Sequence, residues 1–395
     1  MSRIVVTGIG VISSLGNSAE ESHDALVKGS SGLSTGDLFK TKYAGAFPFG
    51  EIKTDTQQLK EKLKATESGV TRTTLLALHA FNEAIADGKL NISDLSSRST
   101  ALVVANTVGG MCMTDELYSD CIAQDNGTPY IDSYDGAAAA MYLQQRFAVK
   151  GIINSINTAC SSSANAIMYG ARLIKNGFAK CAIVGGTDSL GKFTINGFNA
   201  LNILSSNKCR PFDKEREGLN LGEGAAFLIL EREEDAVHKN KYAILSGYAN
   251  TNDAFHPSAL SENGEGPYLA MTKALQVAKM NAAQIDFINA HGTGTQNNDE
   301  SESKAMMRVF NSMPPFISTK SKTGHTLGAA AAVESVFSMI ALKHDEIYPS
   351  LNFSSPIEST GLMPVVKMEK QRLQNVMVNS FGFGGNCSSL IFSKN

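Results

Sequence analysis

One cysteine stands where the character of the sequence changes. The run Thr158-Ala159-Cys160-Ser161-Ser162 follows the β-prone Gly151-Ile152-Ile153, and the apolar residues after it are spaced as on a helix. We therefore expect Cys160 on a strand-to-helix turn, where unpaired N–H groups and the helix dipole make a thiol ionise more readily than a free one. A buried cysteine that acts as a small hydrophobic side chain is the alternative, and the local sequence leaves both open.

Two histidines follow in segments rich in glycine and hydroxyl side chains. Ala290-His291-Gly292-Thr293-Gly294-Thr295 comes after an apolar strand predicted at 285–290, and Lys320-Ser321-Lys322-Thr323-Gly324-His325 precedes a helix predicted at 326–342. Close to a helix N-terminus, His325 should have a lowered pKa and stay neutral. For His291 the alternative is an imidazole that only bonds a neighbouring carbonyl, and for Lys320 it is an ordinary surface lysine.

Two further features could complete a site around these residues. Glu334 has few polar neighbours in its Ala-rich helix, so a buried Glu334 would need a cation, and Lys320 is the natural candidate. The glycine-rich run Phe381-Gly382-Phe383-Gly384-Gly385 could point backbone N–H groups into a cavity, with Phe383 covering it as a mobile flap. This run lacks a Walker lysine, so phosphate binding is not expected, and an ordinary turn between strands is the alternative.

A cysteine nucleophile with two histidines restricts the chemistry. A cysteine protease would use one histidine with an Asn or Asp that orients it. Two histidines suit a reaction that stabilises an enolate or an acyl oxyanion after attack on a thioester.

Composition excludes several classes of protein. The 395 residues carry a net charge of −3 and no basic stripe, so we expect no nucleic-acid partner. We find no apolar run of transmembrane length and no signal peptide, and expect no membrane association. The six cysteines are scattered without C-x-x-C or Cys/His metal spacing, which predicts reduced thiols, a cytoplasmic protein and no metal site.

Alternating strands and helices predict an α/β fold with largely buried sheets. Residues 71–87 and 132–147 are predicted helices, and 101–106 and 225–231 are predicted strands. Gly8-Ile9-Gly10 resembles the start of a dinucleotide-binding fingerprint, but Ser13 takes the third glycine position and no acidic residue ends a second strand. We interpret it as a turn.

The chain also shows a weak internal duplication. Residues 154–166 and 317–329 each contain a strand and a polar turn before an Ala-rich helix. We therefore predict two similar halves: residues 1–240 with the nucleophilic cysteine, and residues 241–395 with both histidines. The duplication would place Cys160 and His325 at equivalent helix starts that face a shared centre.

Taken together, these motifs resemble the β-ketoacyl-acyl-carrier-protein synthases, the elongating condensing enzymes of the thiolase superfamily. The likeness extends from Ile4 to Phe392, and the four signatures around Cys160, His291, His325 and Phe383 occur in the family's order. The blocks 209–213 and 222–226 resemble further parts of the family pattern. The resemblance implies a five-layer αβαβα fold, usually in a dimer.

The resemblance also implies a role for each motif. Cys160 would take an acyl group from acyl carrier protein as a thioester, while His291 and His325 promote decarboxylation of a malonyl extender and stabilise the enolate. The N–H groups of Cys160 and Phe383 would form an oxyanion hole. The remaining implied roles are positioning of the histidines by Lys320 and Glu334, contacts of Thr293 and Thr295 with the pantetheine arm, and acyl-pocket walls at Val108 and Phe198. No cofactor is implied, because the substrates arrive on the phosphopantetheine arm of the carrier protein.

Three departures leave the pathway and partners open. Ser161-Ser162-Ser163 favours polyketide-type over fatty-acid enzymes, Asn386-Cys387 replaces the commoner Thr-Asn, and 71–74 lacks a dense basic pattern for carrier-protein docking. The alternatives are a thiolase-like acyltransferase acting on coenzyme A, with Cys387 as a second cysteine, and a catalytic subunit active only with a chain-length-factor partner. A homodimer and a heterodimer with such a partner both remain open, as do acyl chain length and saturation.

Overall fold

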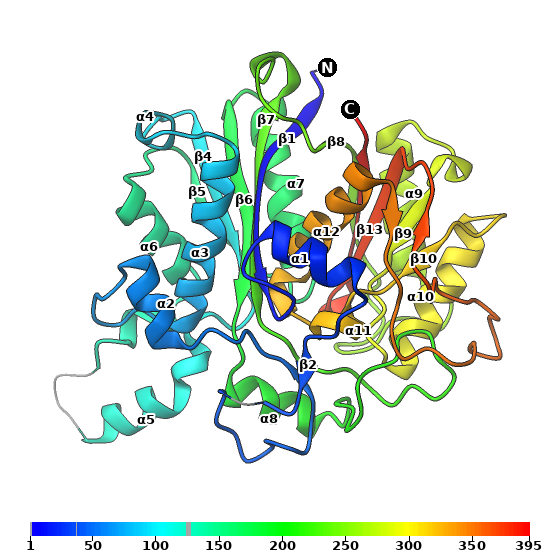
Figure 1. The fold of residues 1–395 in the computed structure, drawn as a ribbon, viewed down its shortest axis with the longest axis horizontal. Helices are drawn as coiled ribbons and strands as arrows, with labels where there is room; N and C mark the ends of the chain where they lie inside the picture. The colour runs from blue at the N-terminus through cyan, green and yellow to red at the C-terminus, as the bar shows by residue number, and fades with distance from the viewer. Residues whose placement is uncertain (1, 37, 124–127) are drawn as a thin grey trace.

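A computed structural model describes residues 2–36, 38–123 and 128–395, and its main feature is a mixed sheet of ten strands (Figure 1). The strands form two sets of five. The first set comprises β1 (Ile4–Ser13), β4 (Thr100–Ala105), β5 (Ile153–Ile156), β6 (Cys181–Asp188) and β7 (Gly224–Arg232). The second set comprises β8 (Ala243–Asn252), β9 (Phe287–Asn289), β10 (Phe316–Ile317), β13 (Asn375–Phe381) and β14 (Asn386–Ser393). Two short ladders pair β2 (Leu33–Ser34) with β3 (Phe49–Gly50), and β11 (Glu346–Ile347) with β12 (Glu369–Lys370).

The two sets have the same topology. Their orders are β5-β4-β6-β7-β1 and β10-β9-β13-β14-β8, so each reads third, second, fourth, fifth, first in chain order. The first three strands of each order are parallel to one another, and the other neighbours are antiparallel. A ladder of only two pairs, Val5 with Ile244 and Val6 with Ala243, connects the sets. The predicted similarity of two halves is confirmed, while the division at residue 240 stays a prediction.

The helices complete five layers. In Figure 1, α7 (Ser162–Lys175) and α12 (Ala330–His344) lie in the middle between the two sets of strands. Helices α3 (Arg72–Asp87) and α6 (Ala138–Phe147) cover the outer face of the first set, and α9 (Glu265–Ala278) and α10 (Gln296–Val309) cover the second. The remaining helices are α1 (Ala19–Val27), α2 (Thr56–Leu63), α4 (Ile92–Leu95), α5 (Thr114–Ala123), α8 (Lys192–Ala200) and α11 (Lys320–Thr323). The αβαβα arrangement is confirmed.

Local sequence accounts for one predicted helix and only part of another. Thr71 caps α3 by accepting a hydrogen bond from the Thr74 N–H, and the helix ends at Gly88, as the sequence predicts. The helix predicted at 132–147 begins only at Ala138, because residues 131–134 form a separate 3-10 turn and Asp135 is extended. The start of this helix is therefore set by the turn before it, which the four consecutive alanines did not predict.

The glycines near the N-terminus are part of a strand, so their interpretation as a turn is wrong. Strand β1 runs through Gly8 and Gly10 while paired with β7. A Cβ atom at Gly10 would lie 2.1 Å from the Ala80 carbonyl oxygen, and one at Gly8 would lie 2.6 Å from the Gly88 nitrogen. The glycines thus allow α3 to pack directly on the strand.

The central helix is unusually apolar. Residues Leu327–His344 are long and apolar enough to span a membrane, contrary to the expectation that no run reaches this length. In the structure, however, 89% of this segment is buried between the two sets of strands. Its apolar side chains are therefore part of the hydrophobic core. The cysteines with described side chains (Cys112, Cys160, Cys181, Cys209 and Cys387) are free thiols, as their spacing predicted.

One buried charge is left without compensation. Lys322 on α11 is fully buried, and its Nζ has no hydrogen-bond partner among the described residues. Burial lowers the pKa of this lysine from 10.5 to about 8. Such a shift corresponds to roughly 3 kcal/mol of lost folding free energy at pH 7, where the lysine is protonated in both states.

We expect Lys322→Met to raise the free energy of unfolding at pH 7 by roughly 2–3 kcal/mol, because it removes the uncompensated charge and keeps the volume. The advantage should shrink as pH rises from about 8 towards 10.5, since the folded wild type then loses its proton before the unfolded chain does. Urea denaturation at pH 7 and pH 9.5 measures both effects. Lys273→Met, at an exposed position on α9, is the matched control, and equal stability of wild type and Lys322→Met at pH 7 would contradict the prediction.

Candidate active site

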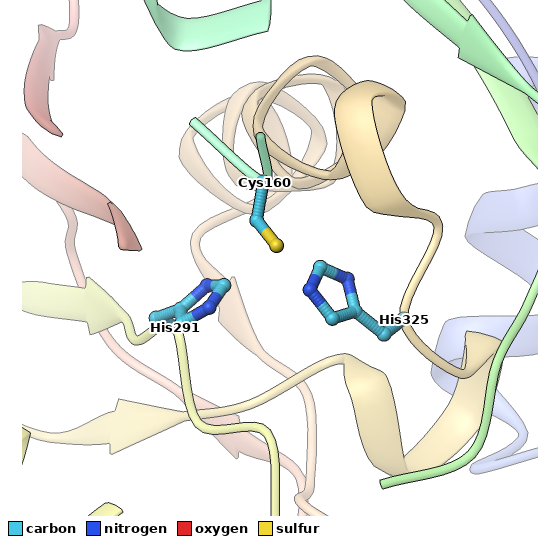
Figure 2. Close-up of side chains that lie close together, drawn as sticks. All are labelled: Cys160, His291 and His325. Carbon is cyan, nitrogen blue, oxygen red and sulfur yellow. The ribbon is translucent and has the colours of Figure 1, made fainter. Parts of the chain in front are cut away.

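Cys160, His291 and His325 meet in the interior of the protein, between the two sets of strands. The Cys160 sulfur and one ring nitrogen of each histidine lie within 4.8 Å of one another. Figure 2 shows the sulfur directed towards the space between the two imidazoles. The rings are edge-on, with centroids 5.3 Å apart and planes at 82°. The structure therefore brings together the three residues that the sequence predicted to act together.

The Cys160 turn connects the end of β5 to the start of α7, as predicted. Ala159 has φ +52°, a left-handed conformation that reverses the chain just before the cysteine. The Ser162 side chain accepts a hydrogen bond from the Thr158 N–H at 2.8 Å, which closes the turn. From the second set of strands, the Ser380 hydroxyl donates to the Cys160 carbonyl at 2.9 Å. The predicted nucleophile is thus held by both halves of the molecule.

The predicted ease of ionisation at Cys160 is wrong. Burial raises the pKa of the Cys160 thiol to about 11, and this effect outweighs the nearby Lys320 charge and the N–H groups of Phe383 and Cys160. Removing the sulfur from water disfavours its anion more than the start of the helix favours it. The thiol is therefore protonated at neutral pH, and its attack on a substrate requires a base that accepts the proton.

His325 is a neutral ring with a defined tautomer. Its Nδ1 accepts a hydrogen bond from the Leu327 N–H at 3.2 Å, so the single ring proton resides on Nε2. That Nε2 is buried and has no partner within the described part of the chain. The pKa of His325 lies well below its ordinary value, as predicted, but burial and then the Lys320 charge are the causes. His325 is therefore placed to donate a hydrogen bond to a substrate oxygen.

His291 is held through its backbone. Lys320 Nζ donates to the His291 carbonyl at 2.7 Å and to Glu334 Oε1 at 2.5 Å, which is the predicted Lys320–Glu334 pair. Both side chains are at least 97% buried. Burial raises the pKa of Glu334 to about 7 while Lys320 opposes this, and burial followed by the Lys320 charge lowers the pKa of His291. The lysine therefore joins one histidine loop to the central helix.

Two acidic residues that the sequence analysis missed fix the same loop. Glu302 accepts hydrogen bonds from the N–H groups of His291 and Gly292, and Asp299 accepts from those of Thr293 and Gly294. Both carboxylates are buried on α10. Their spacing of three residues on a helix directly after a glycine-rich loop was the available signal.

The active-site cavity has a volume of about 390 Å³. Cys160, both histidines, Thr293 and Thr295 line it, together with Phe198 and Phe383. The rings of Phe198 and Phe383 are stacked with centroids 5.8 Å apart, which places Phe383 over one side of the cavity. Val108 is not in the lining, but it packs against the same apolar cluster as Phe198. A thiol, two imidazoles, two threonines and two phenylalanines thus share one cavity.

Cys160, His291 and His325 also have the ligand types of a zinc site. A histidine that binds a metal usually donates its other ring N–H to a neighbouring acceptor. His325 does the reverse, because its Nδ1 accepts from Leu327 and its Nε2 carries the proton. This hydrogen bond favours a proton donor at His325 over a metal ligand.

The fold and this cluster of a thiol and two imidazoles are those expected of an acyl-transfer enzyme. The beta-ketoacyl synthase N-terminal domain model matches residues 1–236, and the C-terminal domain model matches residues 242–354. A 3-oxoacyl-[acyl-carrier-protein] synthase 2 of Rhizobium meliloti (strain 1021) is 35% identical over 421 residues, covering 100% of this chain and 99% of the relative. The chain belongs to the β-ketoacyl synthase family, whose members are condensing acyltransferases.

Solved structures agree with this assignment. The ishigamide ketosynthase/chain length factor superimposes with a TM-score of 0.92 at 28% identity, covering 100% of this chain and 99% of that one. AntDE:AntF, a type II PKS acyl-carrier protein in complex with its ketosynthase bound to the hexaketide, gives a TM-score of 0.89 at 26% identity, with 100% of both chains covered.

We expect Lys320→Met to lower the free energy of unfolding by roughly 3–5 kcal/mol, because it leaves the Glu334 carboxylate buried without its cation. The double variant Lys320→Met/Glu334→Leu should recover much of this loss. Chemical denaturation of the wild type, both single variants and the double variant gives the coupling energy. Additive losses would show that the pair does not act as a unit.

The raised thiol pKa makes Cys160 a slow target for alkylation at neutral pH. Its rate of reaction with iodoacetamide should rise about tenfold per pH unit from pH 7 to near 10, because only the thiolate reacts. Peptide mapping by mass spectrometry identifies modification at Cys160, with Cys160→Ala as the control. A rate that levels off below pH 8 would contradict a pKa of about 11.

Proposed function

We propose that this protein extends an acyl chain by decarboxylative Claisen condensation of a thioester on Cys160 with a malonyl unit carried by acyl carrier protein. The observation that carries the proposal is the convergence of Cys160 Sγ with two neutral imidazoles within 4.8 Å. The known homologues are named as enzymes of this reaction, and their similarity to this chain supports the proposal.

Acyl transfer begins with the protonated thiol. As Cys160 Sγ attacks the thioester carbonyl, the neutral His291 ring accepts the thiol proton, since His325 Nε2 already carries one, and negative charge develops on the carbonyl oxygen. The N–H groups of Cys160 and Phe383 lie near the sulfur and would hold this oxygen. Collapse of the intermediate forms the Cys160 thioester and releases the carrier thiol, which takes up the proton.

Decarboxylation uses the histidines as donors. The thioester oxygen of the malonyl unit would accept hydrogen bonds from His325 Nε2–H and from His291, so that loss of CO₂ leaves an enolate between the two rings. The enolate carbon then attacks the acyl carbonyl on Cys160, forms the new C–C bond and expels the Cys160 thiolate, which takes up a proton from solvent. Lys320 and Glu334 would position the histidines, and Val108 and Phe198 would form walls around the acyl chain.

The cavity lining supports a substrate that is bound to a carrier protein. Thr293 and Thr295 line the cavity and would contact a phosphopantetheine arm, and the proposed reaction would use no metal or other cofactor.

Within the described sheet, β5 pairs only with β4, so its outer edge could pair with a strand of a second subunit. A homodimer or a heterodimer with a chain-length-factor-like subunit would fit this edge, in a cytoplasmic fatty-acid or type II polyketide pathway. We also propose that residues 1–240 and 241–395 are the two domains.

A thiolase-like transfer to coenzyme A is less well supported. That chemistry would use a second catalytic cysteine, and Cys387 was the candidate. Cys387 is fully buried on β14, with its sulfur directed towards Gly266 of α9, and it is not part of the cavity lining. Condensation by Cys160 and two histidines therefore explains the site better.

Two variants separate the proposed steps. Cys160→Ala should abolish formation of the acyl-enzyme, while His325→Ala should still load but release CO₂ from malonyl carrier protein at least roughly 100-fold more slowly. Intact-protein mass spectrometry measures the loading, and trapped CO₂ with detection of the β-ketoacyl product measures the second step. An acyl mass on Cys160→Ala would contradict the assignment, and exchange that depends on coenzyme A without CO₂ release would favour the thiolase-like alternative.

A further inference from the structure

Asn386 lies next to both halves of the proposed oxyanion hole. Its carbonyl accepts a hydrogen bond from the Gly382 N–H at 2.7 Å, and Gly382 directly precedes Phe383. Its side-chain oxygen accepts from the Ser161 hydroxyl at 2.7 Å, and Ser161 directly follows Cys160. One residue thus contacts the immediate neighbour of each N–H group that would hold the thioester oxygen.

The side chain of Asn386 is the centre of a polar network. Besides Ser161, its Oδ1 accepts hydrogen bonds from Asn165 Nδ2 at 3.0 Å and Asn250 Nδ2 at 2.6 Å. Asn165 Nδ2 also donates to the Ser161 carbonyl oxygen at 3.3 Å, which can only accept, so this atom of Asn165 is a nitrogen and the Asn386 atom that faces it acts as the acceptor. Asn165 lies on α7, whereas Asn250 lies on β8, so the network connects the helix that follows Cys160 to the second set of strands.

This connection is needed because the proposed hole is assembled from two separate parts of the chain. The Cys160 N–H comes from the turn before α7, and the Phe383 N–H comes from the loop between β13 and β14. The two backbones pack closely, since a Cβ atom at Gly382 would lie 2.7 Å from the Thr158 oxygen and 3.1 Å from the Cys160 nitrogen. A small displacement of either part would separate the donors from their common target.

We propose that Asn386 is a positioning residue that sets the separation of the Cys160 and Phe383 N–H groups. This inference rests on the proposed function. It predicts that Asn386 affects acyl transfer to Cys160, which uses these N–H groups, more than decarboxylation of malonyl carrier protein, which uses His291 and His325. It also gives a role to Asn386, the first residue of the Asn386-Cys387 pair that departs from the family pattern.

Two variants at this position test the role of the acceptor oxygen. Asn386→Leu keeps the volume but removes the acceptor, and should slow single-turnover acyl transfer from acyl carrier protein roughly 10- to 100-fold. CO₂ release from malonyl carrier protein alone should change by less than about threefold, because the histidine pair is unaltered. Asn386→Asp retains the acceptor oxygens, so its acyl transfer should stay within about threefold of the wild-type rate.

Asn375→Leu is the matched control. Asn375 lies at the other end of the β13–β14 hairpin, where it accepts from the Ser393 hydroxyl at 2.7 Å and donates to the Gln284 carbonyl at 2.8 Å. Its replacement removes a comparable set of hydrogen bonds far along the hairpin from Cys160. It should therefore change stability without slowing acyl transfer relative to CO₂ release.

The outcomes separate this inference from the proposed function. A folded Asn386→Leu protein that slows both steps equally, or neither, overturns the positioning role, as does an Asn386→Asp protein that loads as slowly as Asn386→Leu. If Asn386→Leu does not fold, Ser161→Ala must give the same selective loss of transfer, and an unselective loss overturns the proposal. Wild-type protein that neither loads acyl groups nor releases CO₂, both alone and with a chain-length-factor-like subunit, overturns the proposed function, and this inference with it.

Discussion

Dehydration of the reacting groups is the constraint on which the rest of the structure depends. Burial raises the pKa of the Cys160 thiol and lowers the pKa values of both histidines, so all three are neutral before substrate binds. A neutral imidazole can accept a thiol proton and can also donate a hydrogen bond to an oxygen anion. A permanent thiolate–imidazolium pair would lack the first of these abilities, because both ring nitrogens would already carry protons.

Such a buried site requires partners for the backbone groups that form its walls. The glycine-rich segments near the site are held by buried polar side chains from elsewhere in the chain: Glu302 and Asp299 bind the His291 loop. Asp188 accepts from the N–H groups of Val108 and Gly328, and so connects the loop after β4 to the segment before α12. Because a buried unpaired N–H group is costly, these acceptors also fix the loop conformations.

The duplicated topology explains where the chamber forms. One central helix follows strands of each set: α7 follows β5 of the first set, and α12 follows β10 of the second. The segments at the starts of these helices carry Cys160 and His325. The small residues Ala329–Ala332 at the start of α12 are buried against α7 and both sets of strands, which allows the two halves to approach closely. Lys322 differs from the buried carboxylates, since its Nζ has no hydrogen-bond partner among the residues described.

The sequence by itself determined the α/β class and the duplication, and it predicted the grouping of Cys160, His291 and His325 and the pairing of Lys320 with Glu334, because these depend on local spacing and on residue chemistry. It misjudged the thiol ionisation and the Gly8–Gly10 segment, because desolvation and the close approach of α3 involve residues far apart in the chain. It also missed Asp188 and Asn386, whose hydrogen-bond partners come from other segments. Only the tertiary structure decided which polar groups are dehydrated together, because the pKa of a side chain and the direction of a hydrogen bond are set by neighbours in space.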